Sequence, residues 1–197
     1  MIDFFIGMFL ATLISALFTT RLYRLLFWYS MNSLALAFLA LYIGQDINDN
    51  PLIISGMVTL IFKAIGIPYF LKKLSLKHQI NRSIPPNISV HYAIILIPGI
   101  LVFTFYLAQP LSQMMSEHAN YVAISISSLF LALILMMQHK SIAPKIIGFL
   151  TIENSLFLLA TTATGGMPMI VELGIFFDLL MAIVIINLLF LKNEETT

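Results

Sequence analysis

Four charged side chains fall inside stretches that are otherwise apolar. Glu153 lies in IIGFLTIENSLFLLA, Glu172 and Asp178 lie in MPMIVELGIFFDLLMAIVIINLLFL, and Lys63 lies in LIISGMVTLIFKAIGIPYFL. A charge near the middle of a bilayer costs roughly 2.5 to 3.5 kcal/mol on insertion scales, so a membrane protein rarely keeps several without a use for them. Carboxylates and lysines can take up and release protons. We therefore expect these four side chains to form a proton or ion path.

The composition is that of a membrane protein, with 60% hydrophobic and only 10% charged residues. The chain has no cysteine, which excludes disulfides, thiolate metal sites and iron–sulfur ligation by this chain. The four histidines show no spacing typical of metal ligands, and we expect them to be interfacial or solvated: His78, His91, His118 and His139. We expect no cofactor, no metal and no catalytic residue of its own.

Long apolar runs separated by short polar breaks predict an all-α protein with about seven transmembrane helices. The first segment carries Asp3 and no basic n-region, so we expect it to be a retained span and not a cleaved signal peptide. The predicted spans are residues 2–20, 25–44, 51–71, 90–108, 121–138, 142–163 and 167–191.

Basic residues fall in alternate connections between these spans. By the positive-inside rule, the basic side is cytoplasmic, which puts the N-terminus outside and the C-terminus inside. An odd number of spans agrees with this orientation. The longest connection contains Pro85 and Pro86, and either lipid headgroups or a partner could hold it. The basic residues of the inner side are Arg21, Arg24, Lys72, Lys73, Lys77, Arg82, Lys140, Lys145 and Lys192.

The three acids differ in depth. Glu153 lies about a third of the way into its span from the inner side. Asn154 follows it directly, and we expect the amide of Asn154 to help solvate the carboxylate. Asp178 lies near mid-depth, whereas Glu172 lies nearer the outer end. Six residues of helix offset them by about 9 Å and roughly 120°, so they do not share one face. For Glu172 the alternative is that it simply reaches the outer water. A proton relay through Glu153 and Asp178 is the preferred interpretation. A neutral or hydrogen-bonded Glu153 at a helix interface is the alternative.

Lys63 is followed by Gly66 and Pro68, a spacing that can loosen a helix and free a backbone carbonyl for a polar partner. We expect Lys63 to pair with a carboxylate or to carry protons itself. Snorkelling of its stem to the inner surface is the alternative.

The second and sixth spans resemble each other, with SMNSLALAFLALYIG against TIENSLFLLATTATG. Asn32 and Ser33 then match Asn154 and Ser155, as expected for a parallel duplication. Chance similarity is the alternative. We expect Asn32 and the neighbouring Ser30 and Ser33 to bridge helices.

The C-terminal third, residues 120–197, resembles the three-helix K-type subunit of respiratory complex I. The chain resembles the longer hydrogenase-4 component E proteins more closely than the K-type subunit, on a GFL...EN segment at 148–154, MP.IVELG at 167–174 and FD.L.A at 177–182. The segment KAIGIPYFLKKL at 63–74 resembles a K-A-x-x-I-P stretch of that family. Residues 1–119 would then form an N-terminal four-helix part of a single transmembrane domain.

This resemblance implies a non-catalytic membrane-arm subunit of a group 4 hydrogenase-like or formate hydrogenlyase-like complex, related to complex I and to the C subunit of Mrp-type antiporters. Its partners would be antiporter-like and other membrane subunits in a bacterial or archaeal cytoplasmic membrane. The acids of the K-type helices correspond to Glu153 and Asp178. A stand-alone secondary transporter and a purely structural scaffold subunit are the alternatives.

Overall fold

The computed structural model describes residues 1–77, 84, 90–112, 119–139 and 141–164. Within these ranges the chain is helical, with no β-strand. The predicted seventh span, with Glu172 and Asp178, lies outside the described residues. The elements are α1 (Ile2–Leu17), α2 (Leu22–Asp46), α3 (Asn50–Val58), the π-helix η1 (Thr59–Gly66), α4 (Ile67–Lys77), α5 (Val90–Ser112), α6 (Ala119–Gln138) and α7 (Ile142–Thr164).

Four of the described helical stretches are long and apolar enough to cross a membrane: Leu22–Asp46, Asn50–Lys73, Asn120–Gln138 and Ile142–Ala163. Ile2–Leu17 and Ile94–Pro110 are shorter apolar helices. Six of the seven predicted segments are thus helices in the structure. These features are those of a helical membrane protein.

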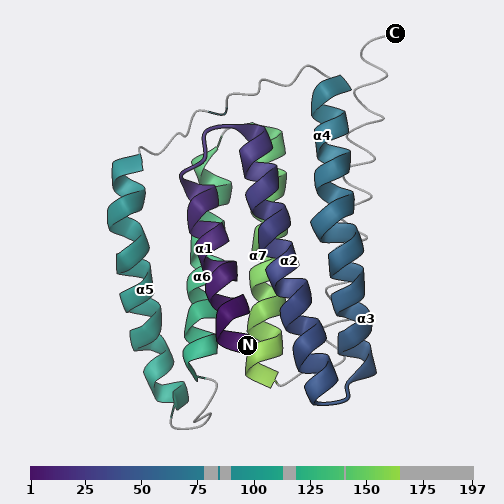
Figure 1. Cartoon of the computed structure of the whole chain (residues 1–197). Coiled ribbons are helices and arrows are strands. Elements are labelled where there is room, and N and C mark those ends of the chain that lie inside the picture. The colour runs from purple at the N-terminus through teal and green to yellow at the C-terminus, as the bar shows by residue number, and fades with distance from the viewer. Residues whose placement is uncertain (78–83, 85–89, 113–118, 140, 165–197) are drawn as a thin grey trace.

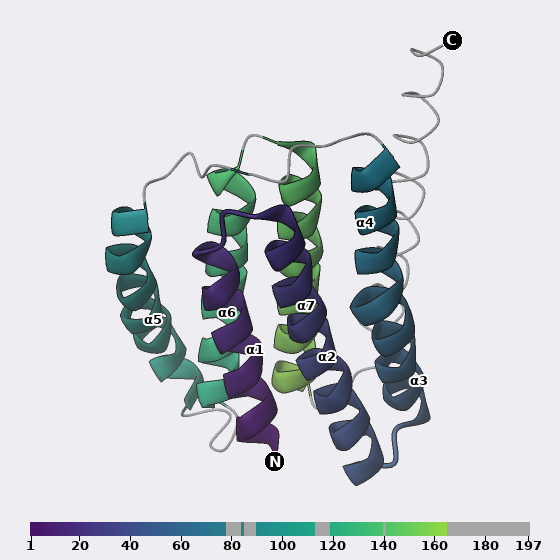
Figure 2. The same ribbon diagram turned by 45° about the horizontal axis from the view of Figure 1, so that its top comes forward.

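The helices stand side by side and run alternately up and down (Figures 1 and 2). The centre of the bundle is formed by α1, α2, α6 and α7, which pack on one another. On one side α5 covers α6, and on the other the continuous rod of α3, η1 and α4 packs along α2. The connections after α1 and α6 and the end of α4 lie at one end of the bundle, which is the end with the basic residues.

Two buried clusters fill the centre of the bundle. The cluster nearer the basic end includes Leu13, Leu25, Tyr29, Leu131 and Leu150, which come from α1, α2, α6 and α7. The other joins α1, α2, α3 and α7 through residues such as Phe9, Leu36, Leu52 and Leu158. The central helices therefore bury side chains against one another along most of their length.

Small residues allow the closest helix approaches. A Cβ added at Gly148 on α7 would lie 2.6 Å from the Cα of Met136 on α6, and one at Gly56 on α3 would lie 2.9 Å from the side chain of Leu41 on α2. Close packing over small residues is a main source of association between membrane helices, because lipid leaves little hydrophobic driving force. Gly56 thus allows α3 to approach α2 closely, and Gly148 allows α7 to approach α6 closely.

The helix boundaries differ from the predicted ones at the basic end. The first helix ends at Leu17 instead of residue 20, where the amide of Thr19 donates to the carbonyl of Ala16 in a tighter turn. The third span continues to Lys77. The long basic connection is anchored at Ile84, whose amide donates to the carbonyl of Thr20 over 2.9 Å and whose side chain is buried.

Candidate proton-transfer site

The structure brings together two of the four charges predicted from the sequence. The Nζ atom of Lys63 on η1 lies 3.6 Å from the Oε1 atom of Glu153 on α7, and the two side chains are only 3% and 6% exposed. They belong to the two helical elements that flank α2. Lys63 does not snorkel, since its side chain is buried inside the bundle.

The distance places the two groups in ion-pair range and beyond the 2.7–2.9 Å of a short charge-assisted hydrogen bond. A lysine ammonium is a point charge on a flexible stem, and it can also lose its proton when buried. The pair therefore consists of two ionisable side chains in ion-pair contact inside the bundle.

A π-helix surrounds Lys63. Residues Thr59–Gly66 follow the wider register, and the amide of Ile67 donates to the carbonyl of Phe62, five residues back. Such segments are rare and occur frequently at functional sites. Because the wider turn changes the direction of side chains, η1 sets how Lys63 projects from the rod.

Pro68 explains why the α-register is not restored at once. In an α-helix the amide of residue 68 would donate to the carbonyl of Ala64, but proline has no N–H. The hydroxyl of Ser30 on α2 donates to this carbonyl instead, over 2.5 Å. A carbonyl released by Gly66 and Pro68 thus has a side-chain partner, and this hydrogen bond attaches the π-helix to α2 one residue from Lys63.

Next to the ion pair, a polar seam crosses three helices. The side-chain amide of Asn154 on α7 donates to Oδ1 of Asn32 over 3.2 Å and to Oγ of Ser33 over 2.9 Å, both on α2. Asn32 in turn donates to the carbonyl of Phe9 on α1 over 3.0 Å. Asn32, Ser33 and Asn154 are all buried. The seam fixes the rotation of α7 against α2, and so sets where Glu153 points.

The amide of Asn154 was expected to help solvate the Glu153 carboxylate. In the structure it donates to α2 instead, because consecutive residues of a helix point about 100° apart. Asn32, Ser30 and Ser33 bridge helices as expected. Of the residues matched in the proposed duplication, Asn154 contacts both Asn32 and Ser33, while the hydroxyl of Ser155 donates to the carbonyl of Thr151 in its own helix. Helices α2 and α7 run in the same direction (Figure 1).

His139 differs from its expected solvated state. It follows α6 in the short connection to α7 and is only 2% exposed. Burial lowers the pKa of its imidazole below the usual 6.5. The neighbouring Gln138 donates from Nε2 to the carbonyl of Leu17 at the end of α1, so this connection packs against α1. A loop position in the sequence does not reveal such packing.

Sequence reasoning also missed Thr12, which joins the polar seam. Its hydroxyl donates to the carbonyl of Phe9 over 2.8 Å, and its Oγ1 lies 3.4 Å from Nδ2 of Asn32. Threonine often satisfies its hydroxyl within its own helix, so nothing in the local sequence separates this residue from a packing one. Among the described residues, no group of histidine, aspartate and glutamate side chains could hold a metal ion.

Comparison with known proteins identifies a relative whose name gives no activity. The chain is 28% identical over 168 residues to the Uncharacterized protein Rv0085 of Mycobacterium tuberculosis, covering 84% of this chain and 75% of the relative. No protein-family model matches the chain, and no solved structure matches it significantly. The aligned region is long enough to include most of the bundle.

Proposed function

We propose that the chain is a non-catalytic membrane subunit that passes protons, or Na⁺, through the Lys63–Glu153 pair within a redox-driven, complex I-related or hydrogenase-like complex. The observation that carries this proposal is the burial of both groups, inside helical stretches that are long and apolar enough to span a membrane. Ionisable residues inside membrane spans are rare and are typical of proton relays and ion pathways.

The energetics favour a use for the pair beyond packing. Two charges removed from water lose solvation that their attraction only partly repays, and a buried pair can often be replaced by apolar residues at no cost. The polar seam of Asn32 and Asn154 already holds α2 against α7. A pair of ionisable groups beside it is therefore not needed for packing alone.

The proposed step is a change of charge state at the pair. When a proton reaches Glu153, its attraction for the Lys63 ammonium falls, and the lysine can then shift or release its own proton. The π-helix around Lys63 agrees with such a role, since π-helical turns occur frequently at functional sites. Charge movement in neighbouring subunits would provide the drive.

We expect the rest of the proposed path to lie in the span predicted at 167–191. Asp178 at mid-depth and Glu172 nearer the outer side would continue the path across the membrane from Glu153, in the span predicted at 167–191. Seven spans with the C-terminus inside would place Lys63 and Glu153 nearer the cytoplasmic side. The resemblance to hydrogenase-4 component E supports antiporter-like subunits as the partners.

The test is the substitution Glu153→Gln in the assembled complex. We expect ion translocation to fall by about a hundredfold, the scale of losing one proton-transfer group, while electron transfer in the partner subunits persists. Inside-out vesicles of the native membrane would report the pH gradient with a dye and electron transfer with the donor of the complex. Thr151→Val is the matched control, because Thr151 is buried two residues from Glu153 on α7 and its hydroxyl donates to the carbonyl of Ile147 in its own helix.

A second variant separates ion transfer from a structural role. Glu153→Gln alone breaks the buried Lys63–Glu153 pair, and removing one member of such a pair costs about 3–5 kcal/mol. The double variant Lys63→Met with Glu153→Gln removes both charges and should assemble like the unmodified protein, yet fail to move ions. Normal translocation in the double variant would show that the pair is only structural.

A further inference from the structure

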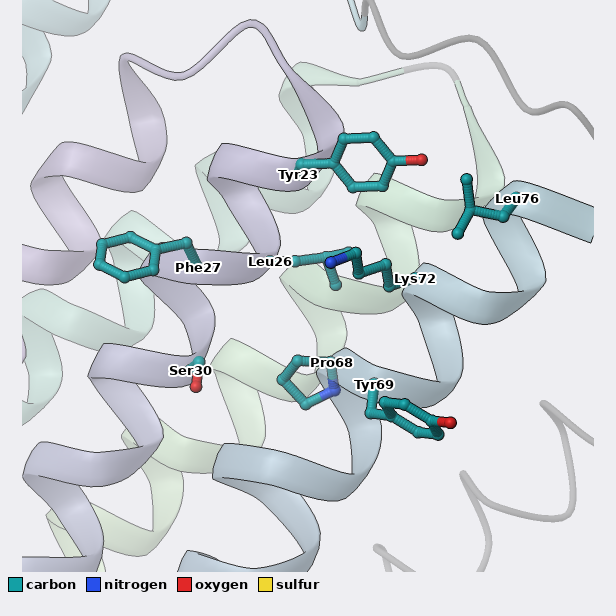
Figure 3. A pocket seen from close by; sticks show the side chains of 8 residues that line it. All are labelled: Tyr23, Leu26, Phe27, Ser30, Pro68, Tyr69, Lys72 and Leu76. Atoms are coloured by element: carbon teal, nitrogen blue, oxygen red, sulfur yellow. The ribbon is translucent and has the colours of Figure 1, made fainter.

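A cavity of about 620 Å³ opens between α2 and α4 at the basic end of the bundle (Figure 3). Its volume lies in the range of small-molecule sites. The lining comes from α2 on one side, including Tyr23, Leu26 and Phe27, and from α4 on the other, including Pro68 and Tyr69. The cavity lies along the side of two helices that together carry membrane-spanning stretches.

The cavity results from the local structure around the ion pair. Ser30 holds the π-helix against α2 at Ala64, and Pro68 begins the next helical turn. Beyond this contact α4 diverges from α2 toward the basic end, as both views show (Figures 1 and 2). Ser30 and Pro68 themselves line the cavity at the end nearer the ion pair.

The lining combines apolar walls with a cationic side chain. Leu26, Phe27 and Pro68 supply the apolar walls, and among the described lining residues Lys72 is the charged one. Figure 3 shows the Lys72 ammonium reaching from α4 toward α2. Tyr23 and Tyr69 also line this space, and tyrosine suits a membrane interface because its ring is apolar and its hydroxyl polar.

These features select the chemistry of the ligand. An apolar groove between spanning helices, with a cation at its basic end, complements an amphiphile that has a negative head and a hydrocarbon tail. Basic pockets between transmembrane helices on the cytoplasmic side bind lipid headgroups by such contacts. We propose that this cavity binds an anionic phospholipid, with its phosphate at Lys72 and an acyl chain between Phe27 and Pro68.

The test compares two lysines that are adjacent in sequence. The full chain would be purified in mild detergent, titrated with phosphatidylglycerol or phosphatidylcholine, and examined by native mass spectrometry for bound lipid. We expect saturable binding with preference for phosphatidylglycerol, and an about fivefold loss of affinity in Lys72→Gln, the scale of one surface lysine on an anionic lipid. Lys73→Gln should bind like the unmodified chain, because Lys73 is exposed on α4 but does not line the cavity.

Each alternative result has a clear meaning. An equal loss in both lysine variants would show general attraction of lipid to a basic helix end, and would overturn the site. Equal binding of the two lipids would overturn the role of Lys72 as an anion contact. Blocking of the cavity by another part of this chain would appear as an absence of saturable binding in the unmodified protein, and would also overturn the proposal.

Discussion

The buried pair consists of a lysine and a glutamate, and these two residue types decide whether the pair can change its charge. Arginine would give a stronger and more rigid pair with a carboxylate, but its guanidinium keeps its proton in proteins. Lysine and glutamate side chains, by contrast, can each lose their charge when buried. The two groups lie 3.6 Å apart in a buried setting, so the charge state of one affects the other strongly. This chemistry suits transfer of a proton better than permanent attachment of two helices.

His139 gives a residue-scale prediction about pH. Its lowered pKa means that the folded protein holds a neutral imidazole, whereas the unfolded chain takes up a proton near pH 6.5. Its contribution to stability is therefore present above pH 6.5 and is lost as the pH falls toward the lower pKa of the folded state. The loss is about 1.4 kcal/mol for each unit of pKa difference. Thermal unfolding in mild detergent between pH 8 and pH 5 would measure it.

The variant His139→Gln should remove this part of the pH dependence, because its amide does not titrate. His78→Gln, in the predicted basic connection, is the matched control and should unfold like the unmodified protein at every pH. If His139→Gln keeps the full loss of stability between pH 6.5 and pH 5, another group causes it.

At the scale of elements, the Ser30–Ala64 hydrogen bond is predicted to compensate for Pro68. Ser30→Ala should destabilise the protein by about 1–3 kcal/mol, because it leaves the buried carbonyl of Ala64 without this donor. In a Pro68→Ala background the new amide can donate to the same carbonyl, so the cost of Ser30→Ala should fall to less than half. Thermal unfolding of the four proteins in this cycle measures the coupling.

Ser15→Ala is the control for this cycle, since the Ser15 hydroxyl bonds only the carbonyl of Ala11 in its own helix at an exposed position. Its effect should stay within about 0.5 kcal/mol. Equal costs of Ser30→Ala with and without Pro68 would mean that the hydroxyl does not replace the missing amide.

The elements themselves could be predicted well from the sequence. Apolar runs predicted the six helical segments that the structure describes, with α3, η1 and α4 as one segment. The Gly66–Pro68 spacing indicated a released carbonyl near Lys63. The π-register of Thr59–Gly66 could not be predicted, since it depends on the contact with Ser30 from another helix. The choice of Glu153 as the partner of Lys63 likewise depends on how α2 and α7 rotate against each other, which the buried Asn32–Asn154 contact sets.

At the scale of the whole molecule, the described helices of the two predicted parts form one bundle. The K-subunit-like part, residues 120–197, was predicted to follow an N-terminal part of four helices. In the structure α6 packs on α1 and α7 packs on α2, so the described helices of the two parts share a buried centre. The ion pair itself crosses from one part to the other. A K-like unit alone would lack Lys63, so the N-terminal part supplies the cation of the proposed path.

The predicted orientation can be tested on the whole chain by labelling of single cysteines, because the natural sequence has no cysteine and gives no background. Asp46→Cys, exposed beside the connection from α2 to α3, should react with an impermeant maleimide in intact cells. Arg21→Cys and Asn193→Cys should react only after permeabilisation, since both are predicted to be inside. Growth and expression of the cysteine-free chain under the same conditions provide the control.

Seven spans put five crossings between Asp46 and Asn193, so these two residues must lie on opposite sides of the membrane. Labelling of both Asp46→Cys and Asn193→Cys in intact cells would therefore exclude seven spans. Protection of Asp46→Cys with labelling of Arg21→Cys would reverse the orientation, and would put the Lys72 cavity in the outer leaflet.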